Sequence, residues 1–237
     1  MNLILLFESD YSTTNRVVIC DRRFHHIRQF HQPVPGQQLR VGLLNGATGS
    51  GTVICLTDQS ITLEVELVQQ PPAALPLTLL LALPRPKMLK RTLQTITSMG
   101  VKQLYLINSY KVDKSYWSTP ALQQDNLREQ LLLGLEQSGD TVLPEVHLRK
   151  RFKPFVEDEL PEIARQTRAL VAHPYHAAPC PGASDEATTL AIGPEGGFIP
   201  YEVEKLQACG FEAIHIGQRI LRVENAVPVL LARLFPI

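Results

Sequence analysis

The first seventy residues of the chain carry hydrophobic residues in short runs. Residues 61–67 alternate between apolar and polar side chains, the pattern of a strand with one buried face. Four further strands are expected at 3–7, 17–20, 38–44 and 53–56. Tight turns are expected at Asn45-Gly46 and around Gly49 and Gly51, because glycine accepts backbone conformations that other residues avoid. Short strands with frequent turns predict a small β-barrel without a long helix.

After Gln69-Gln70-Pro71-Pro72, strands are expected to alternate with helices. Residues 77–83 are a nearly continuous apolar run, typical of a buried strand. Further strands are expected at 101–108, 142–146, 169–172, 190–192 and 213–216. Helices are expected at 88–98, 119–137, 155–166 and 200–208, and a last helix passes through Leu230 and Leu231. This alternation predicts an α/β domain with a mostly parallel sheet covered on both faces. We therefore expect two domains, 1–72 and 73–237.

Composition narrows the class of protein. With 237 residues, 44% of them hydrophobic, the chain can bury a core without disulfide or metal support. The 23 basic residues balance 23 acidic ones, which argues against a whole-surface nucleic-acid binder and leaves local basic patches. Four cysteines without a C-x-x-C pair are expected to be buried thiols in a reducing compartment.

The chain shows no pattern of membrane insertion. Its apolar start, residues 1–7, has no basic segment and is not a signal peptide. The longest apolar run, 73–83, is broken by Pro76 and Thr78, ends before Pro84, and is too short to span a bilayer. We expect a cytoplasmic protein. His173, His176 and His215 do not have the spacing of metal ligands, so no metal is expected.

Two segments between a predicted strand and a predicted helix are candidates for chemistry. The first is I-G-P-E-G-G-F, residues 192–198, and the second is G-Q-R-I-L-R-V-E-N-A, residues 217–226. Glycines there permit close backbone approach to a ligand at the carboxyl ends of strands. The first segment matches neither a phosphate-binding loop nor G-x-G-x-x-G. Each segment also has a simpler interpretation. The glycines of the first could only form a tight strand-to-helix turn, and Arg219, Arg222 and Glu224 of the second could be a solvated helix start with an internal ion pair.

Together, G-P-E-G-G-F and G-x-R-I-L-R-x-E-x-A resemble the RsmE-type family, the uridine-N3 methyltransferases of 16S ribosomal RNA in the SPOUT superfamily. Arg22 to Arg28 resembles the family's N-terminal basic segment, and Lys87 and Glu136-Gln137-Ser138 follow in the family's order. The resemblance implies a PUA-like RNA-binding barrel followed by a domain with a deep trefoil knot. It also implies S-adenosylmethionine as cofactor, a homodimer, and the small ribosomal subunit as partner.

The resemblance assigns residues to roles. Cofactor contacts are expected from Leu170, Ala172, His173, Pro174, Ile192, Gly193, Pro194, Glu195, Gly196, Gly197, Ile216, Gly217, Ile220 and Leu221. RNA contacts are expected from Arg22, Arg23, His25, Arg28, Arg85 and Lys87. Arg222, with Arg219 as second choice, is expected to stabilise the anion formed when uridine N3 loses its proton. Glu224 is expected to orient Arg222 or to accept that proton.

Four positions depart from the family pattern: Thr95, Ser98, Asp140 and Asn225. Asp140 stands where the family usually has arginine, so RNA contact there is expected to change. Two alternatives stay open. One is a methyltransferase of the same fold with another RNA target, and the other is a non-catalytic, dimeric RNA-binding or assembly protein.

Overall fold

The computed structural model describes residues 1–236, which divide into two compact units. The first unit comprises Met1–Ala73 together with Leu132–Leu143, and the second contains the rest of the described chain. Segment 132–143 belongs to the first unit because Leu135 is fully buried against Leu3 and Leu5. The sequence pattern gives no indication of this, since it shows that a residue is apolar and not which partner buries it.

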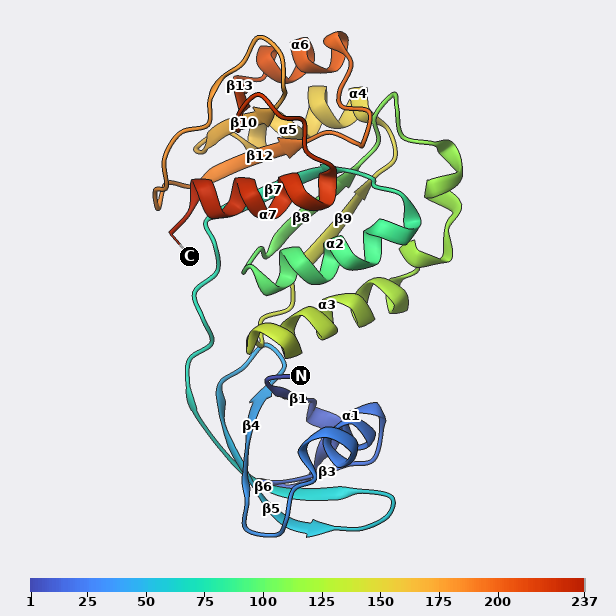
Figure 1. The fold of residues 1–237 in the computed structure, drawn as a ribbon, viewed down its shortest axis with the longest axis vertical. Coiled ribbons are helices and arrows are strands. Elements are labelled where there is room, and N and C mark those ends of the chain that lie inside the picture. Colours follow the sequence, from blue (N-terminus) through green and yellow to red (C-terminus); the bar gives the residue numbers. More distant parts are fainter. Residues whose placement is uncertain (237) are drawn as a thin grey trace. The chain divides into compact units, whose positions relative to one another are not determined.

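A six-stranded sheet with the order β1-β4-β5-β6-β3-β2 forms the first unit (Figure 1). Its strands are β1 (Ile4–Leu6), β2 (Tyr11–Thr13), β3 (Arg16–Ile19), β4 (Gln38–Leu43), β5 (Thr48–Leu56) and β6 (Ile61–Gln69). All neighbours are antiparallel except β1 and β4. Among the described residues the edge strands β1 and β2 do not pair, so the expected barrel is an open, curled sheet.

The predicted turn at Gly49 and Gly51 is wrong, because both glycines lie inside β5. A Cβ atom at Gly49 would collide with the carbonyl oxygen of Glu66 on the neighbouring strand β6. One at Gly51 would lie 3.0 Å from a methyl group of Val41. These glycines therefore allow close packing between strands, which a single sequence does not distinguish from a turn.

A helical segment that the sequence analysis missed covers the inner side of this sheet. It consists of α1 (Arg22–His26) and a π-helical turn (Ile27–His31), with the Asp21 carboxylate accepting from the backbone N–H of Arg23. Only Phe24 and Ile27 carry its buried apolar side, and both are fully buried in the sheet's core. The segment's third apolar residue, Phe30, is 65% exposed, so the sequence does not show which of its apolar residues form a buried helical face.

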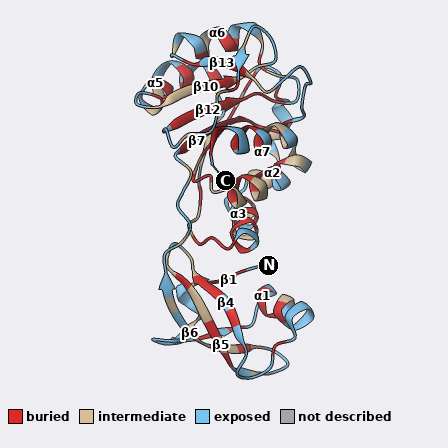
Figure 2. Ribbon diagram, turned by 60° about the vertical axis from the view of Figure 1, so that its left-hand side comes forward, coloured by how far each residue is buried: buried red, intermediate tan, exposed pale blue. Residues whose placement is uncertain are grey.

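The second unit contains a seven-stranded, entirely parallel sheet with the order β11-β13-β10-β12-β7-β8-β9. Its strands are β7 (Leu77–Ala82), β8 (Gln103–Ile107), β9 (Glu145–Arg149), β10 (Arg168–Ala172), β11 (Ala178–Pro179), β12 (Thr188–Ile192) and β13 (Glu212–His215). Every residue of the central strand β12 is buried, as Figure 2 shows for the middle of this sheet.

Helices lie on both faces of this sheet, as the alternating pattern predicts. They are α2 (Pro86–Ser98), α4 (Phe152–Pro154), α5 (Leu160–Ile163), α6 (Pro200–Ala208) and α7 (Val223–Leu234), with a π-helical turn at Phe155–Glu159 and 3-10 turns at Lys114–Ser118 and Pro120–Leu122. Helix α3 (Gln124–Ser138) begins in the second unit and ends in the first, to which the 3-10 turn at Glu8–Asp10 also belongs. Helices α2 and α7 pack against each other, and Figure 2 shows them on the opposite side of β10 and β12 from α5.

Several predicted elements have different bounds. The strand expected at 53–56 runs over Thr48–Leu56, and the helix expected at 155–166 consists of the π-helical turn and α5, which ends at Ile163. Thr119 caps a 3-10 turn instead of the expected long helix, and α3 begins at Gln124. The strand expected at 142–146 runs over Glu145–Arg149. Residues before it are held within the first unit, where the hydroxyl of Thr141 donates to the carbonyl oxygen of Gly46 at 2.5 Å.

The expectation of four buried thiols is only partly right. Cys180 is buried and Cys209 partly buried, whereas Cys20 and Cys55 are exposed. The alternation of β3 places Ile19 inside, and the next residue, Cys20, faces outward.

Candidate active site

Three loops of the second unit meet because the strands before them are neighbours. Strand β10 pairs with β12 on one side and with β13 on the other, all in parallel. The carboxyl ends of parallel neighbours lie at one edge of the sheet, so the loops after Ala172, Ile192 and His215 lie together. They enclose a pocket of about 240 Å³.

All but one of the expected cofactor residues line this pocket. They are Ala172, His173, Pro174, Ile192, Gly193, Pro194, Glu195, Gly196, Gly197, Ile216, Gly217, Ile220 and Leu221. Leu170 is the exception. It lies in the middle of β10, is only 1% exposed, and contributes to the core of the sheet.

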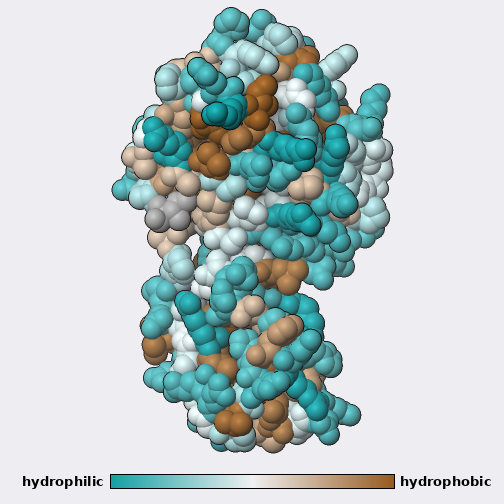
Figure 3. All heavy atoms as spheres, in the orientation of Figure 1, coloured by the Kyte–Doolittle hydropathy of each residue, from teal (hydrophilic) through white to brown (hydrophobic). Residues whose placement is uncertain are grey.

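The sequence analysis missed six lining residues: Tyr175, Ile214, His215, Val223, Ala226 and Leu230. The last three follow each other at intervals of three and four on α7, so they lie on one face of that helix. That spacing was available as a signal. For Tyr175 the sequence offered no signal except its position directly after Pro174. Figure 3 shows hydrophobic residues reaching the surface of the second unit, and Ile220, in the loop before α7, is 68% exposed.

The glycine loop, residues 193–197, has a conformation that other residues would disturb. A Cβ atom at Gly193 would lie 2.9 Å from the backbone nitrogen of Phe198. Gly197 has a φ of +70°, in the left-handed region that favours glycine, and its N–H donates to the Pro194 carbonyl oxygen at 2.7 Å. The glycines therefore form a tight loop whose backbone faces the pocket.

A second loop, residues 108–113 after β8, holds the glycine loop from outside. The ammonium of Lys111 donates to the carbonyl oxygen of Gly196 at 2.6 Å, and a Cβ atom at Gly196 would lie 2.7 Å from Cδ of Lys111. Glu202, only 2% exposed, accepts from the backbone N–H groups of Tyr110 and Ile199 at 2.7 and 3.0 Å. We call residues 108–113 the rim loop.

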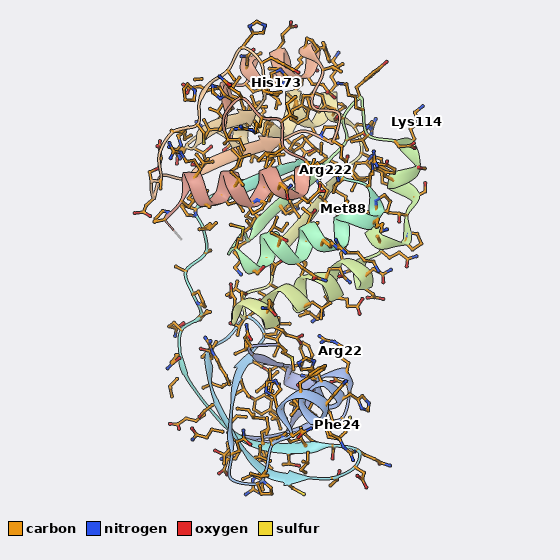
Figure 4. The ribbon with its side chains drawn as sticks, viewed as in Figure 1. Arg22, Phe24, Met88, Lys114, His173 and Arg222 are labelled. Carbon is orange, nitrogen blue, oxygen red and sulfur yellow. The ribbon has the colours of Figure 1, made fainter. Side chains whose placement is uncertain are left out.

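His173 contributes a buried polar atom to the lining of the pocket (Figure 4). Its Nδ1 atom is buried and has no hydrogen-bond partner among the described residues. Burial, with smaller effects of His176 and Lys111, lowers the pKa of His173, so the imidazole is neutral at pH 7. Because a buried polar atom costs free energy when unpaired, this Nδ1 fits a hydrogen bond to a bound ligand.

The three expected catalytic residues lie in different places. Arg219 lines the pocket. Arg222 is exposed at the N-terminal end of α7, where its carbonyl oxygen accepts from the N–H groups of Asn225 and Ala226 (Figure 4). Neither Arg222 nor Glu224 lines the pocket, and no ion pair joins these two among the described residues.

Arg23 is not available for RNA, contrary to the interpretation of its basic segment. It is 3% exposed, and its guanidinium lies 2.6 Å from the carboxylate of Asp10 and 2.7 Å from that of Asp21. It also donates to the carbonyl oxygen of Leu5 at 2.6 Å. A cation this deeply buried remains charged only with such partners, so Arg23 supports the fold of the first unit.

The other expected RNA residues are exposed, and three of them have carboxylate partners. Arg22 makes two hydrogen bonds to Glu136, Arg28 pairs with Asp58 at 2.9 Å, and Arg85 lies 3.9 Å from Glu195. His25 and Lys87 are exposed.

Asp140 is buried, so it does not lie where an RNA contact was expected to change. It is only 3% exposed, and its carboxylate accepts from the backbone N–H of Val142 at 2.9 Å. The departures at Thr95 and Ser98 are similarly local, because both hydroxyls donate to carbonyl oxygens of their own helix.

Residues 1–236 contain neither a membrane-spanning helix nor a cluster of metal ligands. No helix in that part of the chain has both the length and the apolar character needed to cross a membrane. Over the same residues, no group of three or more histidine, cysteine, aspartate or glutamate side chains is arranged to hold a metal ion.

Comparison with known proteins shows which family the pocket-bearing part of the chain matches. A family model described as an RNA methyltransferase domain matches residues 71–235. The ribosomal RNA small subunit methyltransferase E of Treponema pallidum is 27% identical over 230 residues, covering 94% of this chain and 86% of the relative. A protein of that name, with the suffix 1, from Borreliella burgdorferi is 22% identical over 95% of this chain and 94% of its own length.

Solved structures show the same fold. The ribosomal RNA small subunit methyltransferase E of Neisseria gonorrhoeae, bound to S-adenosyl methionine, superposes with a TM-score of 0.75 at 19% identity, covering 98% of this chain and 95% of that one. A putative methyltransferase of Legionella pneumophila with bound SAM gives 0.75 at 18% identity, with the same coverage. These names confirm the RsmE-type resemblance of the motifs. The matched region spans most of the chain, which belongs to the RNA methyltransferase domain family.

Proposed function

We propose that this protein transfers a methyl group from S-adenosylmethionine to N3 of one uridine in 16S ribosomal RNA of the small ribosomal subunit. The observation that carries the proposal is the pocket of three converging loops in a chain of the RNA methyltransferase domain family. The relatives' names support the ribosomal target, and the two neighbours with bound S-adenosylmethionine support the cofactor.

The pocket residues fit this cofactor. The apolar side chains of Ile192, Ile214 and Leu221 suit its adenine ring and uncharged parts, and the buried Nδ1 of His173 suits a polar group. Gly193 and Gly196 have no Cβ atom that would collide with Phe198 and Lys111, so the loop keeps its tight conformation beside the pocket. When bound, S-adenosylmethionine supplies a methyl group on a positively charged sulfur.

The residues of this chain then have to hold the base and stabilise charge. Uridine N3 lies on the pairing edge, so the base must be unpaired or extruded before it enters the pocket. N3 attacks only after it loses its proton, which leaves negative charge on the uracil oxygens. Arg219 is the pocket-lining cation, and we assign it to that charge, with Arg222 as the alternative at the start of α7. The proton acceptor is not assigned.

A knotted backbone and a homodimer are predictions of the family resemblance that belong to this proposal. The RNA contacts expected from Arg22, His25, Arg28, Arg85 and Lys87 are predictions as well. Each is exposed, and partial pairing with carboxylates does not prevent contact with phosphate. Affinity that depends on such contacts is expected to fall as salt rises.

The direct test is methyl transfer to small subunits from a strain that lacks this gene, using labelled S-adenosylmethionine. We expect one labelled uridine, located by a stop of reverse transcription, because a methyl group at N3 blocks base pairing. Cofactor binding without transfer to these subunits would favour another RNA target. A protein that neither binds S-adenosylmethionine nor transfers methyl would be a binding or assembly protein.

The contact of the rim loop with the glycine loop gives a further prediction. Lys111→Ala removes the hydrogen bond to the Gly196 carbonyl oxygen, so the glycine loop is less well ordered before the cofactor binds. We expect Kd for S-adenosylmethionine to rise about fivefold, the usual effect of about 1 kcal/mol. Calorimetric titration measures it.

Lys114→Ala is the matched control, because Lys114 lies further along the same connection and does not line the pocket (Figure 4). Lys111→Arg is expected to retain most of the affinity. Unchanged affinity in Lys111→Ala would show that the glycine loop needs no support from this contact.

A further inference from the structure

The rim loop presents an aromatic ring that neither the fold nor the proposed catalytic steps use. Tyr110 is 79% exposed, more than any other large hydrophobic side chain of the described chain, whose next values are 70% for Val68 and 68% for Ile220. A ring in this position contributes little to the core. Exposed aromatic rings are the common means by which proteins hold unpaired nucleic-acid bases.

The backbone that carries this ring is firmly held. The N–H of Tyr110 donates to the buried carboxylate of Glu202 at 2.7 Å, and the same carboxylate holds the start of α6 through Ile199. The indole N–H of Trp117 donates to the side chain of Asn108 at 2.9 Å, and Lys111 bonds to Gly196. These contacts fix the loop through its backbone and through neighbouring side chains, so little conformational entropy is lost when a ligand contacts the ring.

Tyr110 is linked to the pocket through the next residue of the chain. The next residue, Lys111, contacts Gly196, which lines the pocket, and its ammonium is exposed with donors to spare for a phosphate. An RNA strand that delivers a base to the pocket must also pass its rim. An aromatic face beside an exposed cation suits such a strand, since the ring takes a base and the cation takes the backbone.

We propose that Tyr110 is a stacking platform for an unpaired RNA base that neighbours the target nucleotide. This inference rests on the proposed function, because it needs an RNA substrate at the pocket. It adds a contact outside the cofactor pocket and in the second unit, separate from the basic residues of the first. Stacking needs the ring and not the hydroxyl, which distinguishes it from a hydrogen-bonding role.

The test uses the full chain and the small-subunit methylation assay. Tyr110→Ala and Tyr110→Ile are expected to raise KM for the subunits about tenfold, with kcat and the Kd for S-adenosylmethionine unchanged. Tyr110→Phe keeps the ring and is expected to stay within twofold of the unaltered protein. Thermal unfolding verifies folding, and because the anchoring bond uses the backbone N–H of Tyr110, all three variants should fold.

Each other outcome has a defined meaning. If KM for the subunits is unchanged in Tyr110→Ala while the unaltered protein methylates normally, the stacking platform is refuted and the proposed function stands. If Tyr110→Ile retains the KM, the contact is apolar and not stacking, and the inference fails. A weaker Kd for S-adenosylmethionine in Tyr110→Ala would assign the ring to the cofactor pocket and refute it also. If the unaltered protein transfers no methyl group, the proposed function fails first.

Discussion

Arg219→Ala is expected to lower kcat for methyl transfer by about 10²- to 10³-fold, the usual effect of removing one group that stabilises a developing anion. Arg219 lines the pocket, whereas Arg222 lies outside it at the start of α7. Single-turnover methylation of small subunits measures the effect, with KM for S-adenosylmethionine followed in parallel.

Two further variants test whether the effect depends on the shape of the guanidinium and on its position at residue 219. Arg219→Lys keeps the charge and loses the planar fork, so an intermediate rate is expected. Arg222→Ala is the matched arginine variant and is expected to have the smaller effect. If instead Arg222→Ala removes transfer and Arg219→Ala leaves it intact, the assignment reverses. That result would mean that Arg222 reaches the base only in the complex with RNA.

Arg23→Met is expected to lower the free energy of unfolding by about 3–5 kcal/mol, because it leaves a buried carboxylate without its cation. The side chain of Asp10 is only 9% exposed and lies 2.6 Å from the Arg23 guanidinium. Burial alone would raise the pKa of Asp21, but the hydrogen bonds from Arg23 and the positive charges of Arg23 and Arg22 together outweigh burial and hold that pKa below the ordinary value. Urea unfolding followed by circular dichroism measures the loss.

Arg28→Met is the matched control for this measurement. Arg28 is in the same helical segment and also pairs with an aspartate, but its side chain is 50% exposed and that of Asp58 is 93% exposed. Such surface pairs contribute little, so the change should stay below about 1 kcal/mol. Equal losses in the two variants would mean that burial of Arg23 has no special importance. A second substitution, Asp10→Asn in Arg23→Met, is expected to recover part of the stability.

Local patterns in the chain were enough to predict most elements of the second unit. The apolar run at 77–83, the helix at 200–208 and the glycine-containing loop at 193–197 all depend on residues close in sequence. Hydrophobic period and glycine placement record such local preferences directly. The pocket residues were predicted from the family resemblance, because two of the three loops carry its motifs, residues 192–198 and 217–226.

What the sequence determined by itself was therefore the class of fold, the cofactor loops and the family. The tertiary structure decided which residues share a surface. It buried Arg23 and Asp140, returned segment 132–143 to the first unit, and brought Lys111 against Gly196. It also decided that Arg219 lines the pocket and that Arg222 does not. These outcomes depend on contacts between residues far apart in the chain, and a single sequence carries no record of such pairs, because the same charged or apolar residue is compatible with many partners.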